Sequence, residues 1–124
     1  RSRPVNAIEI LDGMDKVLDE PKKWTQGEYC RTPDGQGTYN GDPEASCFCI
    51  LGAANKVAES VALLDEYRIA IEAMQMAASE LYGTARFAPI ANFNDAPSTD
   101  YIRVKAVISR ARQLLKSHQK ENNA

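Results

Sequence analysis

Cys49-Ile50-Leu51-Gly52-Ala53 is the stretch on which the fold depends, because a glycine interrupts an apolar segment with helical character. A glycine inside a helix costs about 1 kcal/mol relative to alanine. Its presence indicates that another backbone or a large ring packs closely against the helix at Gly52. We expect Trp24 or Phe93 to be that partner.

Two further short stretches, called islands here together with the Gly52 stretch, contain residue types that helix formation alone does not require. They are Trp24-Thr25-Gln26-Gly27 and Phe93-Asn94-Asp95-Ala96-Pro97. They lie far from the Gly52 stretch in the chain. Together the three islands indicate loops that are held against helices.

The length and net charge of the chain limit its number of domains and its possible classes of partner. The chain has 124 residues, a hydrophobic fraction of 44% and a net charge of -2. This length suits a single domain over residues 1–124. A nearly neutral chain has no bulk attraction to nucleic acid or to an anionic membrane, and no apolar run approaches the roughly 18 residues of a membrane span. We expect no signal peptide, a cloning remnant or trimmed start at residues 1–3, and a frayed tail over residues 117–124.

The hydrophobic pattern predicts a mainly α fold of about four helices, with a short β-hairpin loop between helices 1 and 2. Ile8, Leu11 and Leu18 share the expected buried face of the first helix. Asp42 and Pro43 have the chemistry of a helix start. The expected helices run from about Pro4 to Asp19, from Pro43 toward Ser60, from Val61 to Tyr82, and from Ser98-Thr99-Asp100 to about Lys116.

Two connecting segments have features of their own. Glu28–Thr32 and Gly37–Asn40 are expected to pair as a hairpin around the turn residues Pro33-Asp34-Gly35. Thr84–Pro97 is irregular but apolar through Phe87, Ile90 and Phe93, and we expect it to fold back over the core.

The three cysteines are Cys30, Cys47 and Cys49. An odd number at uneven spacing is a poor disulfide framework. Reduced thiols and a cytoplasmic location are therefore expected. Cys49 is a candidate nucleophile, but it lies well inside its expected helix and His118 is far away in sequence. A small buried filler is the expected role of this thiol.

A metal site would need Cys30, Cys47, Cys49 and His118 as ligands. Their spacing matches none of the paired patterns of structural zinc. We therefore expect no metal, no cofactor and no catalytic residue.

Asn94 and Asp95 form a polar pair in an apolar segment. Buried polar groups need hydrogen bonds, so we expect Asn94 to bridge to the Trp24–Gly27 turn and Asp95 to accept from the turn at Ser98. The alternative role is a carboxylate in a pocket beside Trp24 and Tyr29. The candidate ligand-binding residues are Trp24, Tyr29, Cys49, Asn94 and Asp95.

The last predicted helix is basic. It carries Arg103, Lys105, Arg110, Arg112, Lys116 and Lys120. The acidic first helix is the expected partner of this face, and nucleic acid is not an expected ligand. The sequence leaves open whether the helix binds phosphates. The glycine-rich stretch Asp34–Gly41 lacks the Lys-Ser/Thr ending of a phosphate-binding loop.

The three islands resemble a family of small uncharacterised bacterial and phage domains. In that family a W-x-x-G turn precedes a C-x-x-G-A helix, and an aromatic-N-D turn precedes the final helix. Trp24 to Gly27, Cys49 to Ala53 and Phe93 to Asp95 carry these motifs here. The resemblance implies the fold and a bacterial or phage source, and it implies no reaction.

Two functional interpretations follow. We expect a small non-enzymatic binding or regulatory protein that acts by surface contacts with another protein. The alternative is a small enzyme or ligand-binding domain with a pocket around Trp24, Cys49 and Asp95. The identity of the partner and the oligomeric state do not follow from the sequence.

Overall fold

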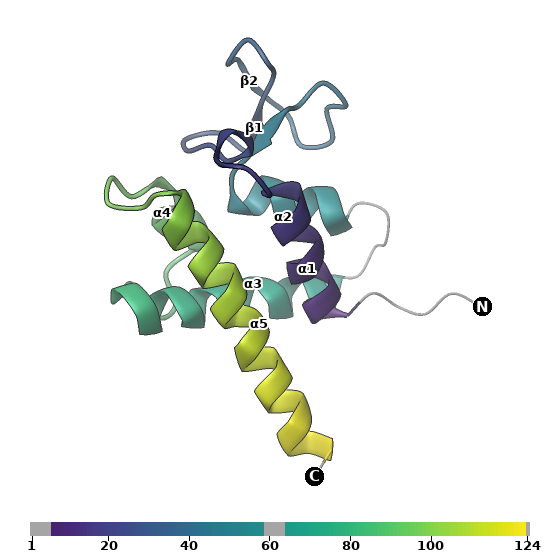
Figure 1. Cartoon of the computed structure of the whole chain (residues 1–124), viewed down its shortest axis with the longest axis vertical. Helices are drawn as coiled ribbons and strands as arrows, with labels where there is room; N and C mark the ends of the chain where they lie inside the picture. Colours follow the sequence, from purple (N-terminus) through teal and green to yellow (C-terminus); the bar gives the residue numbers. More distant parts are fainter. Residues whose placement is uncertain (1–5, 59–63, 124) are drawn as a thin grey trace, which may run out of the picture.

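The computed structural model of the chain describes residues 6–58 and 64–123, without the side chains of residues 64 and 119–123. In this part of the chain five α-helices surround the core, and a small three-stranded antiparallel sheet comes between α1 and α2 in the chain and stands at one end of the molecule (Figure 1). The predicted mainly α fold is confirmed. The elements are α1 (Ala7–Val17), the 3-10 helix η1 (Pro21–Lys23), β1 (Cys30–Arg31), β2 (Gly37–Thr38), β3 (Cys47–Phe48), α2 (Ile50–Ala58), α3 (Leu64–Tyr82), α4 (Ile90–Asp95) and α5 (Tyr101–Asn123).

Helix α1 is at the centre of the core and contacts α2, α3 and α5. The side chain of Asn6 caps its start by accepting a hydrogen bond from Glu9 N at 2.9 Å. Pro4, the expected first-turn residue, lies outside the described residues. The fully buried side chains of this segment are Ile10, Leu11, Met14 and Leu18, whereas Ile8 is only half-buried.

Helix α5 is joined to the end of α1 by charged and polar contacts. Lys105 Nζ lies 2.7 Å from Asp15 Oδ1 and donates to the backbone oxygens of Asp15 and Leu18, each at 2.9 Å. A lysine at a helix C-terminus satisfies carbonyl groups that have no intrahelical partner. Arg112 lies 3.2 Å from Asp12. The expected pairing of the basic last helix with the acidic first helix is therefore confirmed at these two positions.

The predicted hairpin forms, and a third strand extends it. In β1, Cys30 pairs with Thr38 of β2 and with Phe48 of β3. Gly35 turns the hairpin with φ +88°, a conformation that favours glycine.

The expected helix start at Asp42 and Pro43 is wrong. Asp42 accepts hydrogen bonds from Glu44 N at 2.9 Å and from Thr38 Oγ1 at 2.6 Å, so it stabilises a turn instead. Pairing with β1 then keeps Cys47 and Phe48 extended. Helix α2 consequently begins at Ile50.

The prediction of a close approach at Gly52 is confirmed, but its expected partner is wrong. A Cβ on Gly52 would overlap the backbone oxygen of Tyr29, and neither Trp24 nor Phe93 occupies that place. The glycine lets the segment after η1 lie directly on α2. This contact fixes the position of the loop that carries Tyr29.

Residues 84–97 are more ordered than predicted. Gly83 ends α3 with φ +73°, as expected. The segment then contains α4, so Asn94 and Asp95 belong to a helix and not to an irregular loop. Phe93 is buried on the core, but Phe87 is 87% exposed, so the expected folding of this segment over the core does not include it.

The helices α3 and α5 cross at a steep angle (Figure 1), with Glu80 near the end of α3 in contact with Arg110 and residues nearer the start of α3 beside the later turns of α5. Leu81 was expected in the buried stripe of α3 and is 43% exposed. Alanines fill the contact instead, with Ala70, Ala73, Ala77 and Ala78 buried. In the described residues, no helix has the length and apolar character needed to cross a membrane.

Replacing Gly52 by Ala is expected to lower the free energy of unfolding by about 1–3 kcal/mol, although alanine favours helix, because the methyl group collides with the Tyr29 carbonyl. Thermal melting measures the change. Ser109→Ala, at an exposed helical position of α5, is the control and should melt like the parent. A Gly52→Ala variant that melts above the parent contradicts the close contact.

Candidate functional site

The side chain of Asn94 connects the three sequence islands. It is 1% exposed, and its Oδ1 accepts from Trp24 Nε1 at 2.8 Å and from Ile50 N at 3.0 Å. Its Nδ2 donates to the backbone oxygen of Thr25 at 3.1 Å and to Asp95 Oδ1 at 2.9 Å. The expected bridge from Asn94 to the Trp24–Gly27 turn is thus present. It also supplies an acceptor to the first backbone N–H of α2, which has no partner within the helix.

Asp95 and Gln26 complete the connection between α4 and this turn. Asp95 Oδ1 accepts from Gly27 N at 2.9 Å, so the expected acceptance from the turn at Ser98 is wrong. Gly27 has φ +82°, which allows its N–H to face the carboxylate. Gln26 Nε2 donates to the backbone oxygens of Asn94 and Ala96 at 2.8 and 3.1 Å. These bonds serve carbonyl groups at the end of α4.

Cys49 directly precedes α2 and acts as its N-terminal cap. Its Sγ accepts from Gly52 N at 3.3 Å, and its backbone oxygen accepts from Ala53 N at 2.9 Å. Its own N–H donates to the backbone oxygen of Tyr29 at 3.0 Å. The segment Gly27–Tyr29 is therefore held at one end by Asp95 and at the other by Cys49.

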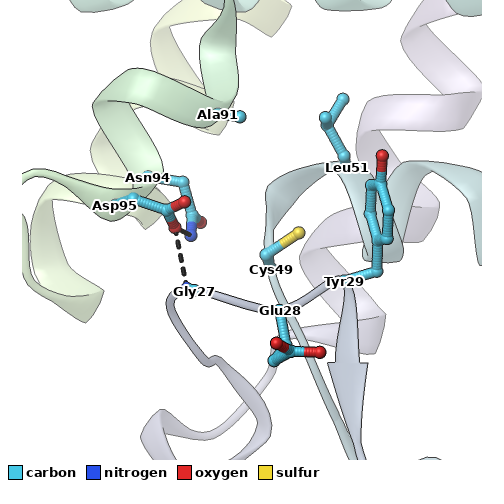
Figure 2. A pocket seen from close by; sticks show the side chains of 8 residues that line it. All are labelled: Gly27, Glu28, Tyr29, Cys49, Leu51, Ala91, Asn94 and Asp95. Carbon is cyan, nitrogen blue, oxygen red and sulfur yellow. Dashed lines mark hydrogen bonds between the residues drawn. The ribbon is translucent and has the colours of Figure 1, made fainter. Parts of the chain in front are cut away.

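A pocket of about 320 Å³, here called the Cys49 pocket, opens between this segment, α2 and α4 (Figure 2). Cys49 is 6% exposed, whereas Tyr29 is 51% exposed and Asp95 is exposed at the rim. The carboxylate of Glu28 points away from the thiol and lies against Gly37 of β2 (Figure 2). The lining residues are Gly27, Glu28, Tyr29, Cys49, Leu51, Ala91, Asn94 and Asp95.

Four of the five sequence-predicted site residues meet at this pocket. Tyr29, Cys49, Asn94 and Asp95 line it, and Trp24 stands behind Asn94 as a hydrogen-bond donor. The structure thus brings the candidate residues together. Whether they bind a ligand stays a prediction.

The thiol of Cys49 is poorly suited to nucleophilic catalysis. Burial raises its pKa, while hydrogen bonds from the backbone N–H groups of Gly52 and Leu51 act in the opposite direction and the charge of Asp95 raises it further. A reactive cysteine requires a lowered pKa and a nearby base. His118, the single histidine of the chain, lines a different depression between α3 and α5.

All three cysteines are free, and Cys30 is buried with its Sγ donating to the backbone oxygen of Tyr39 at 3.2 Å. Burial raises the pKa of Cys30 as well. Over residues 6–58 and 64–123, no group of three or more His, Cys, Asp and Glu side chains is placed to hold a metal ion.

Arg31 organises the loop in a way that sequence reasoning did not predict. Its Nε donates to Thr25 Oγ1 at 2.8 Å, and its terminal nitrogens donate to the backbone oxygens of Gly35 and Gln26, each at 3.0 Å. This role could have been predicted from an arginine that stands near glycines and turn residues, because backbone carbonyls in such loops have no strand partner and need other donors. Gln26 was quoted within its island, but no role was assigned to it.

The fold and the pocket define a small helical domain in which two loops and a short helix are pinned together by a buried asparagine. The chain belongs to DUF6197, a family of unknown function whose model matches residues 2–114. The match includes all three islands. The predicted membership of a family of unknown function is therefore confirmed. No curated protein and no solved structure matches the chain.

Replacing Asn94 by Ala is expected to lower the free energy of unfolding by about 1–3 kcal/mol, because Trp24 Nε1 and Ile50 N lose their acceptor inside the fold. Denaturant unfolding measures the loss. Asn92→Ala is the matched control, since Asn92 is an exposed residue of the same helix and should unfold like the parent. Equal stability of the two variants contradicts a structural role for Asn94.

Cys49 is expected to react slowly with a thiol reagent in the native protein, and the half-buried Cys47 is expected to react first. The reaction at Cys49 should accelerate as pH rises, because the raised pKa keeps the thiol protonated at neutral pH. Mass spectrometry of the labelled peptides gives the order of modification. A Cys47→Ser variant removes the fast site, and fast labelling of Cys49 ahead of Cys30 in that variant contradicts the prediction.

Proposed function

We propose that this domain is a non-enzymatic binding protein that acts by contact with another protein, and that the Cys49 pocket receives a lysine or arginine side chain of the partner. The observation that carries the proposal is the chemistry of the pocket wall. Leu51, Ala91 and the ring of Tyr29 offer apolar surface beside the exposed carboxylate of Asp95. A long basic side chain has the matching form, with an apolar stem and a charged end.

The charge of the pocket supports a cationic ligand. Two of its eight lining residues, Glu28 and Asp95, are acidic and none is basic. Asp95 Oδ1 accepts from Gly27 and Asn94, while Oδ2 makes no hydrogen bond within the described part of the chain. The half-exposed ring of Tyr29 adds a face that attracts cations. The carboxylate of Glu28 lies against β2, so Asp95 is the acidic group on which the proposal rests.

The state of Cys49 supports binding over catalysis. The thiol is buried, its pKa is raised, and its sulfur is used to cap α2. The alternative of a small enzyme around Trp24, Cys49 and Asp95 requires an activated nucleophile, which this environment opposes. The pocket therefore has the features of a recognition site with a structural cysteine beneath it.

A bacterial or phage source and a cytoplasmic setting are part of the proposal. The motifs of the three islands support the source. The three free cysteines support a reducing compartment.

Titration with Nα-acetyl-lysine methylamide is expected to shift the backbone amide resonances of Gly27, Tyr29 and Leu51, with weak affinity because a single side chain offers little contact area. Nα-acetyl-norleucine methylamide, which has no charge, should shift them much less. Two-dimensional nitrogen–proton NMR measures both titrations. Shifts of equal size for the two probes, or shifts confined to other surfaces, contradict the proposed ligand class.

The variant Asp95→Asn separates recognition from folding. Asparagine keeps an oxygen that accepts from Gly27 N, so stability should change little, while the loss of charge should weaken lysine binding by about tenfold. Glu44→Gln is the control, since it removes one exposed negative charge outside the pocket. If Asp95→Asn binds the lysine probe like the parent, the carboxylate is not the recognition element.

A further inference from the structure

Most polar side chains of the Cys49 pocket are already engaged within the chain, which limits what they can offer a ligand. Asn94 lines the pocket, but its Oδ1 accepts two hydrogen bonds and its Nδ2 donates two. A side-chain amide has two lone pairs and two N–H groups, so Asn94 has no hydrogen-bonding position left. The carboxylate of Glu28 lies against Gly37 and points away from the thiol (Figure 2). Asp95 is therefore the acidic side chain that is left to receive a charged ligand.

The carboxylate of Asp95 offers a ligand one oxygen and not two. Its Oδ1 accepts from Gly27 N and from Asn94 Nδ2, both at 2.9 Å, whereas Oδ2 makes no hydrogen bond within the described part of the chain. The two bonds to Oδ1 also fix the rotation of the carboxylate. Presenting both oxygens to a ligand would break them, and hydrogen bonds to a charged group are among the stronger ones in proteins.

A single available oxygen distinguishes between the two basic side chains. The guanidinium of arginine is planar and makes its strongest pair with a carboxylate through two parallel N–H···O bonds, which need both oxygens. The ammonium of lysine is a compact charge for which one acceptor is enough. At Asp95 an ammonium keeps its full interaction, whereas a guanidinium loses one of its two bonds or disrupts the bonds that hold Gly27.

The walls beside Asp95 add to this preference. Leu51 and Ala91 are apolar, so N–H groups of a guanidinium that turn toward them lose water without gaining an acceptor. An ammonium at the exposed Asp95 keeps its other N–H groups in water. In Figure 2, Asp95 and Tyr29 stand on opposite sides of Cys49, so the methylene chain of a lysine that reaches Asp95 can lie over the thiol.

We propose that the Cys49 pocket recognises the unmodified ammonium group of a lysine, in preference to arginine, through an end-on hydrogen bond to Asp95 Oδ2. This inference rests on the proposed function, because it concerns the same pocket, and it adds the hydrogen-bonding chemistry of the ligand and a form of regulation. Trimethylation of the partner's lysine keeps the charge but removes every N–H donor, so it weakens the complex. Quaternary ammonium groups are bound by cages of aromatic rings, whereas Tyr29 is the one aromatic residue of the described chain that lines this pocket.

Three charged probes in one series of NMR titrations test the inference. Nα-acetyl-lysine methylamide, Nα-acetyl-arginine methylamide and the trimethyl-lysine analogue are each added to the full chain. The amide shifts of Gly27, Tyr29 and Leu51 give the dissociation constants. The arginine and trimethyl-lysine probes should each bind about five- to tenfold more weakly than the lysine probe, because each loses a charge-assisted hydrogen bond.

The same probes with a variant show whether the discrimination arises at the carboxylate. In Asp95→Asn the lysine and arginine probes should bind with similar affinity, since the charged oxygen that separates them is gone. Glu44→Gln removes an exposed negative charge outside the pocket and should leave the ratio of the two affinities unchanged.

The outcomes separate this inference from the proposed function. An arginine or trimethyl-lysine probe that binds as tightly as lysine overturns the inference and leaves a pocket for basic side chains in place. A preference for lysine that persists in Asp95→Asn overturns it as well, because the preference then has another source. If none of the three probes shifts the amides of the pocket, the proposed function fails and the inference fails with it.

Discussion

The hydrogen bonds of one buried amide, Asn94, are the constraint on which the rest of this structure depends. Asn94 joins α4, the Trp24 turn and the start of α2, three segments that are separated by tens of residues in the chain. A buried amide that loses a partner carries a desolvation cost of a few kcal/mol, so only an arrangement that satisfies both its oxygen and its nitrogen is stable. Because Asn94 lies on α4, its hydrogen bonds allow fewer positions of α4 against the core than apolar packing alone allows.

The same constraint shapes the Cys49 pocket. Once α4 is fixed, Asp95 holds Gly27, and the segment from Gly27 to Tyr29 must then cross α2 at Gly52, where no side chain intervenes. Cys49 fastens the far end of this segment through its backbone N–H. The wall of the pocket is thus made of backbone that is tied at both ends. Under the proposed function, a ligand meets a backbone wall that is already in place, so little of its binding free energy is spent on ordering that wall.

Contacts can be predicted from the sequence where a residue type is favourable in only a few structural settings. A glycine inside a helix, an asparagine in an apolar segment and a positive-φ turn each indicate a specific contact, and Gly52, Asn94 and Gly83 behave accordingly. The sequence did not predict β3, because Asp42-Pro43-Glu44 has the local chemistry of a helix start. Pairing with a strand sixteen or so residues away overrides that chemistry, and such non-local pairing leaves no short-range pattern. Helix α4 was missed for a related reason, since its six residues have no side-chain cap and depend on tertiary contacts.

The ion pairs within the chain determine which charged groups of this domain stay exposed. Lys105 and Arg112 form ion pairs with acidic residues of α1. Lys105 also donates a hydrogen bond to the backbone oxygen of Leu18 at the end of that helix. With the pair between Arg110 and Glu80, three of the six basic residues in the sequence of α5 are engaged within the chain. Asp95, on α4, keeps one carboxylate oxygen outside the buried network. Under the proposed function, the exposed carboxylate of Asp95 lies beside apolar side chains, so the charge that a partner presents at that position decides specificity.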